Sequence, residues 1–302
     1  MTLTGLAAFP SAVPTTRPQR RGGQSRLAWG LLAPSLVCLT AFTYWPLAQV
    51  LGRSIWAGGP STGNYARLFA DAHFTQAVVN NLIYAAGTII PSLGFALLFA
   101  VVLNETTKVT LALRALFVLP LMIPLVGAAA LFSFLLLPGE GLLDTYLAPM
   151  GLGMANWLGD PALALPSIIA ITVWKNTGYY MLFFLAGLAA VPVDLLDAAR
   201  IDGARTWARF HHVTLPMLGP TFGFVLPIAA LNALTAIDHV VTLTQGGPSD
   251  ATNLVLYYIY QQAEQNHDNG LAAAATVLSV AALLALTAGS LRLTDRGLHH
   301  AS

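Results

Sequence analysis

Charged residues, small residues and two adjacent histidines are concentrated between Asp194 and Leu218, where the sequence reads DLLDAARIDGARTWARFHHVTLPML. This stretch lies between two of the most apolar runs of the chain, one ending near Val191 and the next starting near Leu215. Carboxylates, guanidinium groups and imidazoles can cap helices, bind a charged partner or take part in acid–base and metal chemistry. The rest of the sequence has to decide between these roles.

Motifs for catalysis and for nucleotide or metal binding are missing from the sequence. Neither Lys108 nor Lys175 lies in a G-x-x-x-x-G-K-[ST] loop, so no P-loop is present. No H-E-x-x-H or G-x-S-x-G pattern occurs, and adjacent His211 and His212 would point about 100° apart on a helix. Cys38 is the single cysteine, which excludes a cysteine-built metal site; we expect a buried thiol. We therefore expect no enzyme activity, no metal and no bound cofactor.

The composition is that of an integral membrane protein. Hydrophobic residues make up 56% of the chain and charged residues only 9%, whereas an ordinary soluble domain is about 25% charged. A soluble fold with so little charge would expose large apolar patches. The formal net charge of +1 does not predict a nucleic-acid partner, which needs a basic face. The composition predicts an all-α protein embedded in a lipid bilayer.

Six apolar runs are long enough to cross a bilayer, which takes about 20 residues of helix. They lie at roughly 27–50, 81–103, 115–137, 163–190, 216–241 and 271–291. Strands of a membrane β-barrel are about ten residues long and alternate in polarity, which does not fit these runs. Residues 1–26, rich in Pro, Ser, Thr and Arg, are expected to form a disordered tail, and 27–302 one transmembrane domain.

Basic residues predict the orientation of these spans. Most lie before the first span, after the second, after the fourth and after the sixth: Arg17, Arg20, Arg21, Arg26, Lys108, Arg114, Arg200, Arg205, Arg209, Arg292 and Arg296. The opposite side holds only Arg53 and Arg67. Both termini and the loop at 192–214 are therefore predicted to be cytoplasmic.

The loop at 192–214 is predicted to form two short helices joined by a turn. Pro192 and Asp194 suit the start of the first helix, Gly203 allows a change of direction, and Ala204–His211 has an amphipathic pattern. From the residues alone, two interpretations stay open. The loop is either an interfacial element that holds the bundle at the lipid headgroups, or a docking element whose small residues let a soluble partner approach closely.

The segment DAARIDGARTWARFHHVTLP resembles the EAA loop of binding-protein-dependent ABC importer permeases. That loop reads E-A-A, three residues, G, nine residues, I, one residue, L-P. This sequence keeps every spacing, with Asp in place of Glu and Val in place of Ile. The matching residues are Asp197, Ala198, Ala199, Gly203, Val213, Leu215 and Pro216.

The resemblance covers the transmembrane region. VWKNTGYYMLFFLAGLAAVP (173–192) is similar to the segment before the EAA loop in carbohydrate-uptake permeases, and LTQGGPSDATNLVLYYIYQQA (243–263) to the outer loop before their last span. FTYWPLAQVLGRSIW (42–56) resembles their first-span exit. Glu264 departs from the usual aromatic residue, and the short first outer loop lacks the inserted domain of the maltose-system subunit. The sequence looks most like the first permease of sn-glycerol-3-phosphate or disaccharide systems.

The resemblance implies one of two permease subunits of an ABC importer in the bacterial cytoplasmic (inner) membrane. A second permease would complete the pathway for a sugar or glycerol-phosphate-type solute, and a periplasmic or lipid-anchored binding protein would deliver that solute. Two copies of a cytoplasmic ATPase would bind ATP-Mg. The residues expected to couple to the ATPase are Asp197, Ala198, Ala199, Asp202, Gly203, Ala204, Phe210, Leu215 and Pro216. The turn at Gly246, Gly247 and Pro248 is expected to face the binding protein.

Lys175 and Asp238 lie inside apolar runs, where a charge costs at least about 2.5 kcal/mol and usually faces a cavity or a partner. A structural ion pair between them, or snorkelling to an interface, is favoured over contact with the solute. Tyr179, Tyr180 and Asn232 are weaker candidates for the translocation pathway, because an aromatic or amide side chain in a span more often serves packing.

A secondary transporter driven by an ion gradient is the alternative class, and a membrane enzyme is the third. Inverted repeats with broken helices in matching halves would favour the secondary transporter, and no such repeat is evident. The solute itself is not specified, because few polar residues line the spans.

Overall fold

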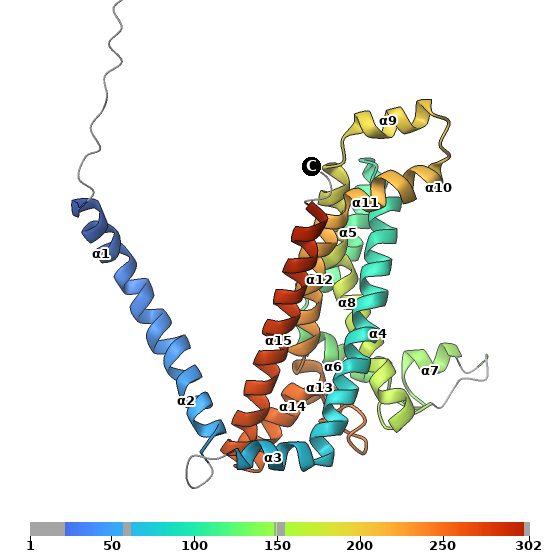
Figure 1. Ribbon diagram of the computed structural model, residues 1–302. Helices are drawn as coiled ribbons and strands as arrows, with labels where there is room; N and C mark the ends of the chain where they lie inside the picture. The colour runs from blue at the N-terminus through green and yellow to red at the C-terminus, as the bar shows by residue number, and fades with distance from the viewer. Residues whose placement is uncertain (1–21, 57–61, 148, 150–154, 299–302) are drawn as a thin grey trace, which may run out of the picture. The chain divides into compact units, whose positions relative to one another are not determined.

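The computed structural model describes residues 22–56, 62–147, 149 and 155–298, and the regular elements in these ranges are helices (Figure 1). The chain divides into two compact units, residues 1–49 and 50–302. In the first unit, α1 (Gly22–Leu39) continues through a π-helical turn η1 (Thr40–Tyr44) into α2 (Trp45–Ser54), and the boundary between the units falls within α2. Residues 22–26, expected as tail, are the first residues of α1; residues 1–21 lie outside the described ranges. Cys38 is exposed rather than buried, since the described part of its unit is one continuous helix with nothing described packed on it.

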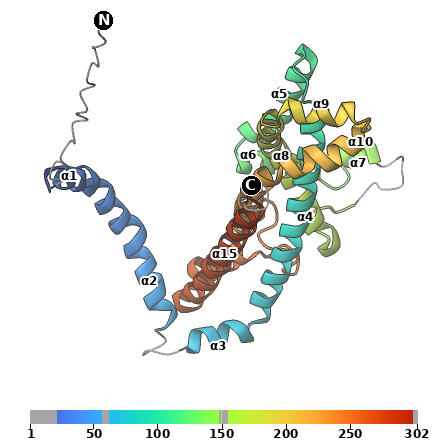
Figure 2. The ribbon, with the colours of Figure 1, turned by 45° about the horizontal axis from the view of Figure 1, so that its top comes forward.

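The second unit is a helical bundle (Figures 1 and 2). Its first half contains α3 (Gly63–Ala70), α4 (Ala72–Val102), α5 (Lys108–Met122), α6 (Leu125–Leu135), α7 (Leu142–Leu147) and α8 (Pro161–Ala189). Its second half contains α9 (Val193–Ile201), α10 (Thr206–Arg209), η3 (Phe210–Thr214), α11 (Leu215–Met217), α12 (Gly219–Leu234), α13 (Asp238–Leu243), α14 (Val255–Tyr260), η4 (Gln261–Gln265) and α15 (Asn269–Leu298).

Within the described ranges, five helical segments are long and apolar enough to cross a membrane: Ala28–Ser54, Ala72–Val102, Pro161–Ala189, Gly219–Leu243 and Asn269–Gly289. A sixth is obtained when α5 and α6 are counted as one span. These segments overlap the six apolar runs of the sequence. The second begins at Ala72 rather than near residue 81, because Asp71 caps the helix by accepting from the backbone N–H of His73 at 2.8 Å.

The run at 115–137, expected as one helix, is instead a bent pair. The axes of α5 and α6 differ by 98°, and the bend lies between Pro120 and Pro124, two residues that carry no backbone N–H. The run at 216–241 is also interrupted, since α12 ends at Leu234 and α13 starts at Asp238. Two of the expected spans are thus broken helices, which a membrane protein tolerates where neighbouring groups satisfy the backbone.

The core of the bundle lies between α4, α8 and α12. The longest interface is that of α4 with α8, where Ala96 and Ala100 of α4 let the helix axes come close to Tyr180 and Phe184 of α8. Val225 of α12 closes the same cluster. At one end of the bundle, α9 and α10 project from it, and at the opposite end lie α3 and α14 (Figure 1).

Candidate functional site

The projecting segment, residues 193–209, is a hairpin of α9 and α10. Pro192 occupies the N-cap of α9, and Asp194 lies in its first turn without a side-chain capping bond. The helix ends in a Schellman motif: the N–H of Ala204 donates to the oxygen of Ala199 at 3.0 Å, and that of Gly203 to Arg200 at 3.1 Å. Gly203 has a φ of 78°, a conformation that costs other residues energy. The turn expected from the sequence therefore lies at Gly203.

The α9–α10 hairpin exposes apolar side chains. No residue of α9 is buried, and Val193, Ile201 and Trp207 are 65%, 86% and 74% exposed. Asp197 and Arg200 form an ion pair at 3.0 Å in which both side chains are more than half exposed, so it adds little to stability. A projecting element that buries nothing of its own, and carries apolar groups between charges, is suited to bind another protein.

The residues expected to couple to an ATPase divide into a tip and a base. The tip consists of Asp197, Ala198 and Ala199 on α9 and of Asp202, Gly203 and Ala204 in the turn. The base consists of Phe210 at the start of η3 and of Leu215 and Pro216 in α11.

A cavity of about 180 Å³ lies at the base, between the end of α4, the end of α8 and α10. Its lining includes Val101, Leu188 and Arg209. The Nε of Arg209 is buried there without a hydrogen-bond partner. This cavity separates the base of the hairpin from the packed bundle, and sequence reasoning did not identify it.

Lys175 contacts backbone oxygens rather than a carboxylate. Its Nζ donates to the oxygen of Pro120 at 3.1 Å and to that of Ile123 at 2.5 Å. The ion pairs found among the described residues involve neither Lys175 nor Asp238, so the expected pair between them is wrong. The reason is positional: Lys175 faces the break between α5 and α6, whereas the exposed Asp238 opens α13.

Two of the other pathway candidates, Tyr180 and Asn232, border a small cavity together with polar side chains of α4. Asn232 of α12 donates to the Tyr180 hydroxyl at 3.1 Å, and both border a cavity of about 10 Å³ together with Thr88, Ser92 and Asn176. Such a volume holds about one water molecule, and the buried Ser92 hydroxyl lacks a protein partner. Tyr179 instead packs edge-on against Phe183, with ring centroids 5.1 Å apart.

Three members of this polar cluster, Thr88, Ser92 and Asn176, were missed by the sequence reasoning. Their signal was present, since Thr88 and Ser92 on α4, and Asn176 and Tyr180 on α8, are each four residues apart. That spacing places each pair on one helix face.

The turn at Gly246, Gly247 and Pro248 is tightly held by its own loop. Gly246 has a φ of 79°, and a Cβ there would lie 2.6 Å from the Tyr257 ring. The Thr252 hydroxyl donates to the oxygen of Gly247 at 2.6 Å. The turn is therefore a shaped, pre-organised element, and it needs glycine at position 246.

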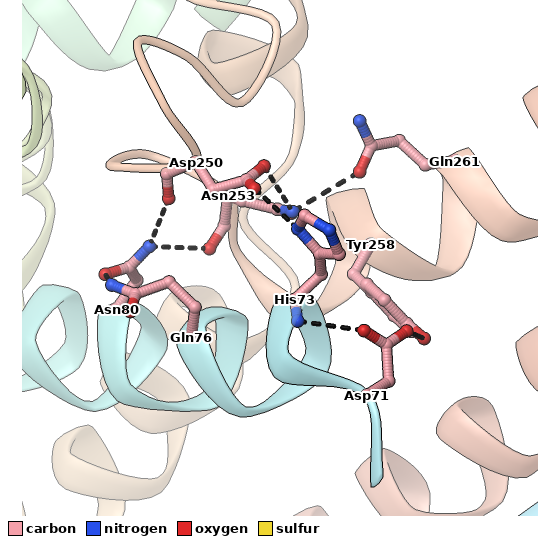
Figure 3. A network of polar contacts seen from close by, with 8 residues as sticks. All are labelled: Asp71, His73, Gln76, Asn80, Asp250, Asn253, Tyr258 and Gln261. Carbon is pink, nitrogen blue, oxygen red and sulfur yellow. Dashed lines mark hydrogen bonds and ion pairs between the residues drawn. The ribbon is translucent and has the colours of Figure 1, made fainter. Parts of the chain in front are cut away.

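A polar network joins this loop to the start of α4 (Figure 3). Asn80 Nδ2 donates to the backbone oxygens of Asp250 and Asn253 at 2.7 and 3.1 Å. His73 Nδ1 lies 2.6 Å from an Asp250 carboxylate oxygen, and Asn253 donates to Gln261 Oε1 at 3.3 Å. Asn80 and Asn253 are both buried. Segments about 170 residues apart in the chain are thus held as one surface at the α3 end of the bundle.

A second set of contacts lies beside this network. Arg67 of α3 forms an ion pair with Asp268 at 2.5 Å. Burial opposes ionisation of Asp268, but the backbone N–H of Leu271 and the Arg67 guanidinium outweigh it and lower the pKa of this carboxyl. In the described ranges, no group of three His, Cys, Asp or Glu side chains is placed to hold a metal ion.

Comparison with known proteins identifies the family. The family model described as "Binding-protein-dependent transport system inner membrane component" matches residues 92–300. The chain belongs to this family. The match contains the α9–α10 hairpin, Lys175 and the turn at 246–248.

Relatives of this chain match over nearly their whole length. The sn-glycerol-3-phosphate transport system permease protein UgpA of Agrobacterium fabrum is 30% identical over 283 residues, which cover 91% of this chain and 96% of the relative. The trehalose/maltose transport system permease protein MalF of Thermococcus litoralis is 29% identical, covering 87% of this chain and 92% of the relative. The chain is therefore a transporter permease, with no insertion or deletion the size of a domain relative to these proteins.

Two solved structures share the fold of this family member. The crystal structure of a bacterial ABC transporter that imports the acidic polysaccharide alginate aligns with a TM-score of 0.82 at 22% identity, over 91% of this chain and 96% of the other. The alginate transporter in complex with a pentasaccharide-bound periplasmic protein aligns with a TM-score of 0.81 at 23% identity, over 92% and 98%.

Proposed function

We propose that the chain is one of two permease subunits of an ATP-driven importer in a bacterial cytoplasmic membrane. The solute is a sugar or a glycerol-phosphate-type molecule, the kinds of cargo that its relatives UgpA and MalF are named for. Family membership supports the transport role, and the distribution of basic residues supports cytoplasmic termini.

The α9–α10 hairpin is the observation that carries the proposal. In this assignment each permease presents such a hairpin to one of two cytoplasmic ATPase subunits, which bind ATP-Mg. Exposed Ile201 and Trp207 supply apolar contacts, Asp197 supplies charge, and the Schellman turn at Gly203 keeps the tip rigid. A rigid tip transmits the closure of the ATPase pair to the transmembrane helices as a rigid-body movement.

At the opposite end, the turn at Gly246–Pro248 and the Asn80–Asp250 network form the surface that receives a solute-binding protein. Its pre-organisation favours docking, because little conformational entropy remains to be lost. Between the two ends, the pathway runs past Lys175, Tyr179, Asn232 and Asp238 and is completed by the second permease. Helix breaks at α5–α6 and α12–α13 lie in this region.

Reconstitution tests the proposal against a secondary transporter. The chain, its partner permease and the ATPase are placed in proteoliposomes, with ATP enclosed and the binding protein outside. We expect solute uptake that requires ATP and the binding protein and persists when ionophores dissipate ion gradients. Uptake that follows an imposed ion gradient without ATP would contradict the proposal. An azido-ATP analogue should label the ATPase and not this chain.

A further inference from the structure

The break between α5 and α6 leaves backbone oxygens without their usual donors, among them those of Pro120 and Ile123. In an α-helix, the oxygen of residue i accepts from the N–H of residue i+4. The residue four positions after Pro120 is Pro124, which has no N–H. Within its own segment, the Pro120 oxygen is reached only by the N–H of Ile123 at 3.3 Å. Ile123 itself is extended, with φ −82° and ψ 125°, so its oxygen points out of the helix.

Lys175 of α8 supplies the missing donors. Its ammonium group donates to both oxygens, at 3.1 Å for Pro120 and 2.5 Å for Ile123. Hydrogen bonds from a charged donor are stronger than those between neutral groups. The carbonyl end of α5 also carries the negative end of the helix dipole, which favours a cation there. The Lys175 ammonium group thus gains hydrogen-bond acceptors at membrane depth, and the two backbone oxygens gain a donor.

Neighbours of Lys175 on the same face of α8 hold the two arms of the bend. A Cβ on Gly178 would overlap the backbone oxygen of Phe117, so α5 lies directly against α8 at this point. Trp174 packs edge-on against Phe132 of α6, with ring centroids 5.2 Å apart at an angle of 72°. Positions 178, 175 and 174 therefore contact, in this order, the arm before the break, the break itself and the arm after it.

We propose that Lys175 is a positioning residue that replaces the donor Pro124 lacks and fixes the bend between α5 and α6. Because α6 packs against α13, the bend also sets the position of the helix that begins with Asp238. In the importer, Lys175 then acts on transport through the shape of the pathway and not by attracting a charged solute. Its effect on transport rests on the proposed function, whereas its effect on the bend does not.

A distance measurement tests the effect on the bend. In a Cys38→Ser background, spin labels replace Leu113 on α5 and Leu131 on α6, both exposed, and the interspin distance is measured in the assembled complex. A continuous helix would place their backbones about 27 Å apart, and the bend places them closer. We expect Lys175→Met to lengthen and broaden the distribution. Lys108→Met on α5, which loses the same charge at an exposed position, should leave it unchanged.

The Lys175→Gln variant distinguishes the effect of the side chain's hydrogen bonds from the effect of its positive charge. The Gln amide keeps two N–H donors, with its nitrogen one bond closer to the backbone, and Lys175→Arg keeps donors and charge. We expect both variants to retain the short distance and most of the uptake, while Lys175→Met loses tenfold or more in uptake, since the loss of even one charge-assisted bond corresponds to a factor of about ten or more. If Lys175→Met fails to assemble, Lys175→Gln decides: an assembled complex with the short distance supports the proposal.

Three results would overturn it. The first is an unchanged distance distribution in Lys175→Met. The second is a Lys175→Gln complex that keeps the short distance but loses uptake as completely as Lys175→Met, because the charge itself would then be required. The third is failure of Lys175→Gln to assemble. The complexes could also show the expected distances while none of them transports solute, not even the one that retains Lys175. That result would contradict the proposed function and leave the positioning role supported.

Discussion

The hydroxyl of Tyr258 donates to a carboxylate oxygen of Asp71 at 2.6 Å. Asp71 also caps α4 through the N–H of His73, so one carboxylate joins the start of a transmembrane helix to α14. The Tyr258 side chain is buried, and its surroundings raise the pKa of the phenol, first through burial and then through the bond to Asp71. The hydroxyl therefore remains a donor throughout the physiological pH range.

Removing this donor should loosen the α3 end of the bundle. Tyr258→Phe leaves Asp71 with an unfilled acceptor, and the loss of a hydrogen bond to a charged group costs about 1.5–3 kcal/mol. We expect a lower thermal unfolding midpoint in detergent. Tyr260→Phe, at a position 39% exposed, is the matched control and should unfold like the unmodified protein. Equal midpoints for the two variants would show that the Asp71 contact contributes nothing.

Acid should weaken the neighbouring ion pair of Arg67 with Asp268. Because folding lowers the pKa of Asp268, the pair stabilises the fold above the carboxyl's unfolded pKa of about 3.9. That stabilisation is lost as the pH falls through the lower folded value. We expect no contribution to pH dependence between about pH 5 and 8 and a loss below about pH 4. Its size should stay below about 1 kcal/mol, since the Arg67 side chain is 57% exposed.

Asp268→Asn tests this sign. Thermal midpoints of the variant and the unmodified protein, followed from pH 7 to pH 3, should differ most at neutral pH and converge in acid. A difference that grows as the pH falls would contradict the assignment.

Close contact of α8 with α5 should make Gly178 intolerant of substitution. In Gly178→Ala, the added methyl group would overlap the Phe117 oxygen, and neither backbone can yield without moving a helix. We expect a destabilisation of about 1–3 kcal/mol, the usual cost of overpacking, seen as a reduced yield of intact complex. Gly94→Ala adds the same methyl group to α4, where nothing lies within 4 Å, and should be harmless. Equal yields for the two variants would refute the close packing.

The rigidity of the Schellman turn at Gly203 leads to a separate prediction about coupling between the hairpin and the ATPase. Gly203→Ala meets no atom within 4 Å, but it forces a φ of 78° on a residue with a side chain, at a cost of about 1–2 kcal/mol. We expect assembly to persist while stimulation of the ATPase by the loaded binding protein declines. Gly219→Ala also meets no atom within 4 Å and should couple normally. Full stimulation in Gly203→Ala would show that the turn need not be rigid.

The helical spans could be predicted from the sequence because lipid leaves the backbone few alternatives to helices. The spacing from Asp197 through Gly203 to Pro216 located the hairpin for a similar reason: glycine permits the left-handed turn and proline fixes φ locally. Both features depend on residues close together in the chain, so they can be read from the sequence.

The partner of Lys175 could not be predicted in this way. Its acceptor on Ile123 is a backbone oxygen 52 residues away. The pattern of side chains along the sequence does not indicate which backbone oxygens lack a donor. Sequence reasoning therefore chose Asp238, the one acidic residue inside the predicted spans. The sequence shows the prolines at 120 and 124. Their consequence, that the backbone oxygens of Pro120 and Ile123 attract a cation, follows only once the bend is known.

The most direct test of the importer assignment is whether the hairpin binds the ATPase. Ile201→Glu places a charge at a position 86% exposed on α9, where it would disrupt an apolar contact without disturbing the fold. Tyr146→Glu, 76% exposed on α7 and away from the hairpin in Figure 1, is the matched control. Co-purification of the ATPase with each tagged variant is measured beside recovery of the second permease. We predict that Ile201→Glu loses the ATPase and keeps the second permease, while Tyr146→Glu keeps both. Undiminished ATPase recovery with Ile201→Glu would contradict the assignment of the α9–α10 hairpin as the docking element.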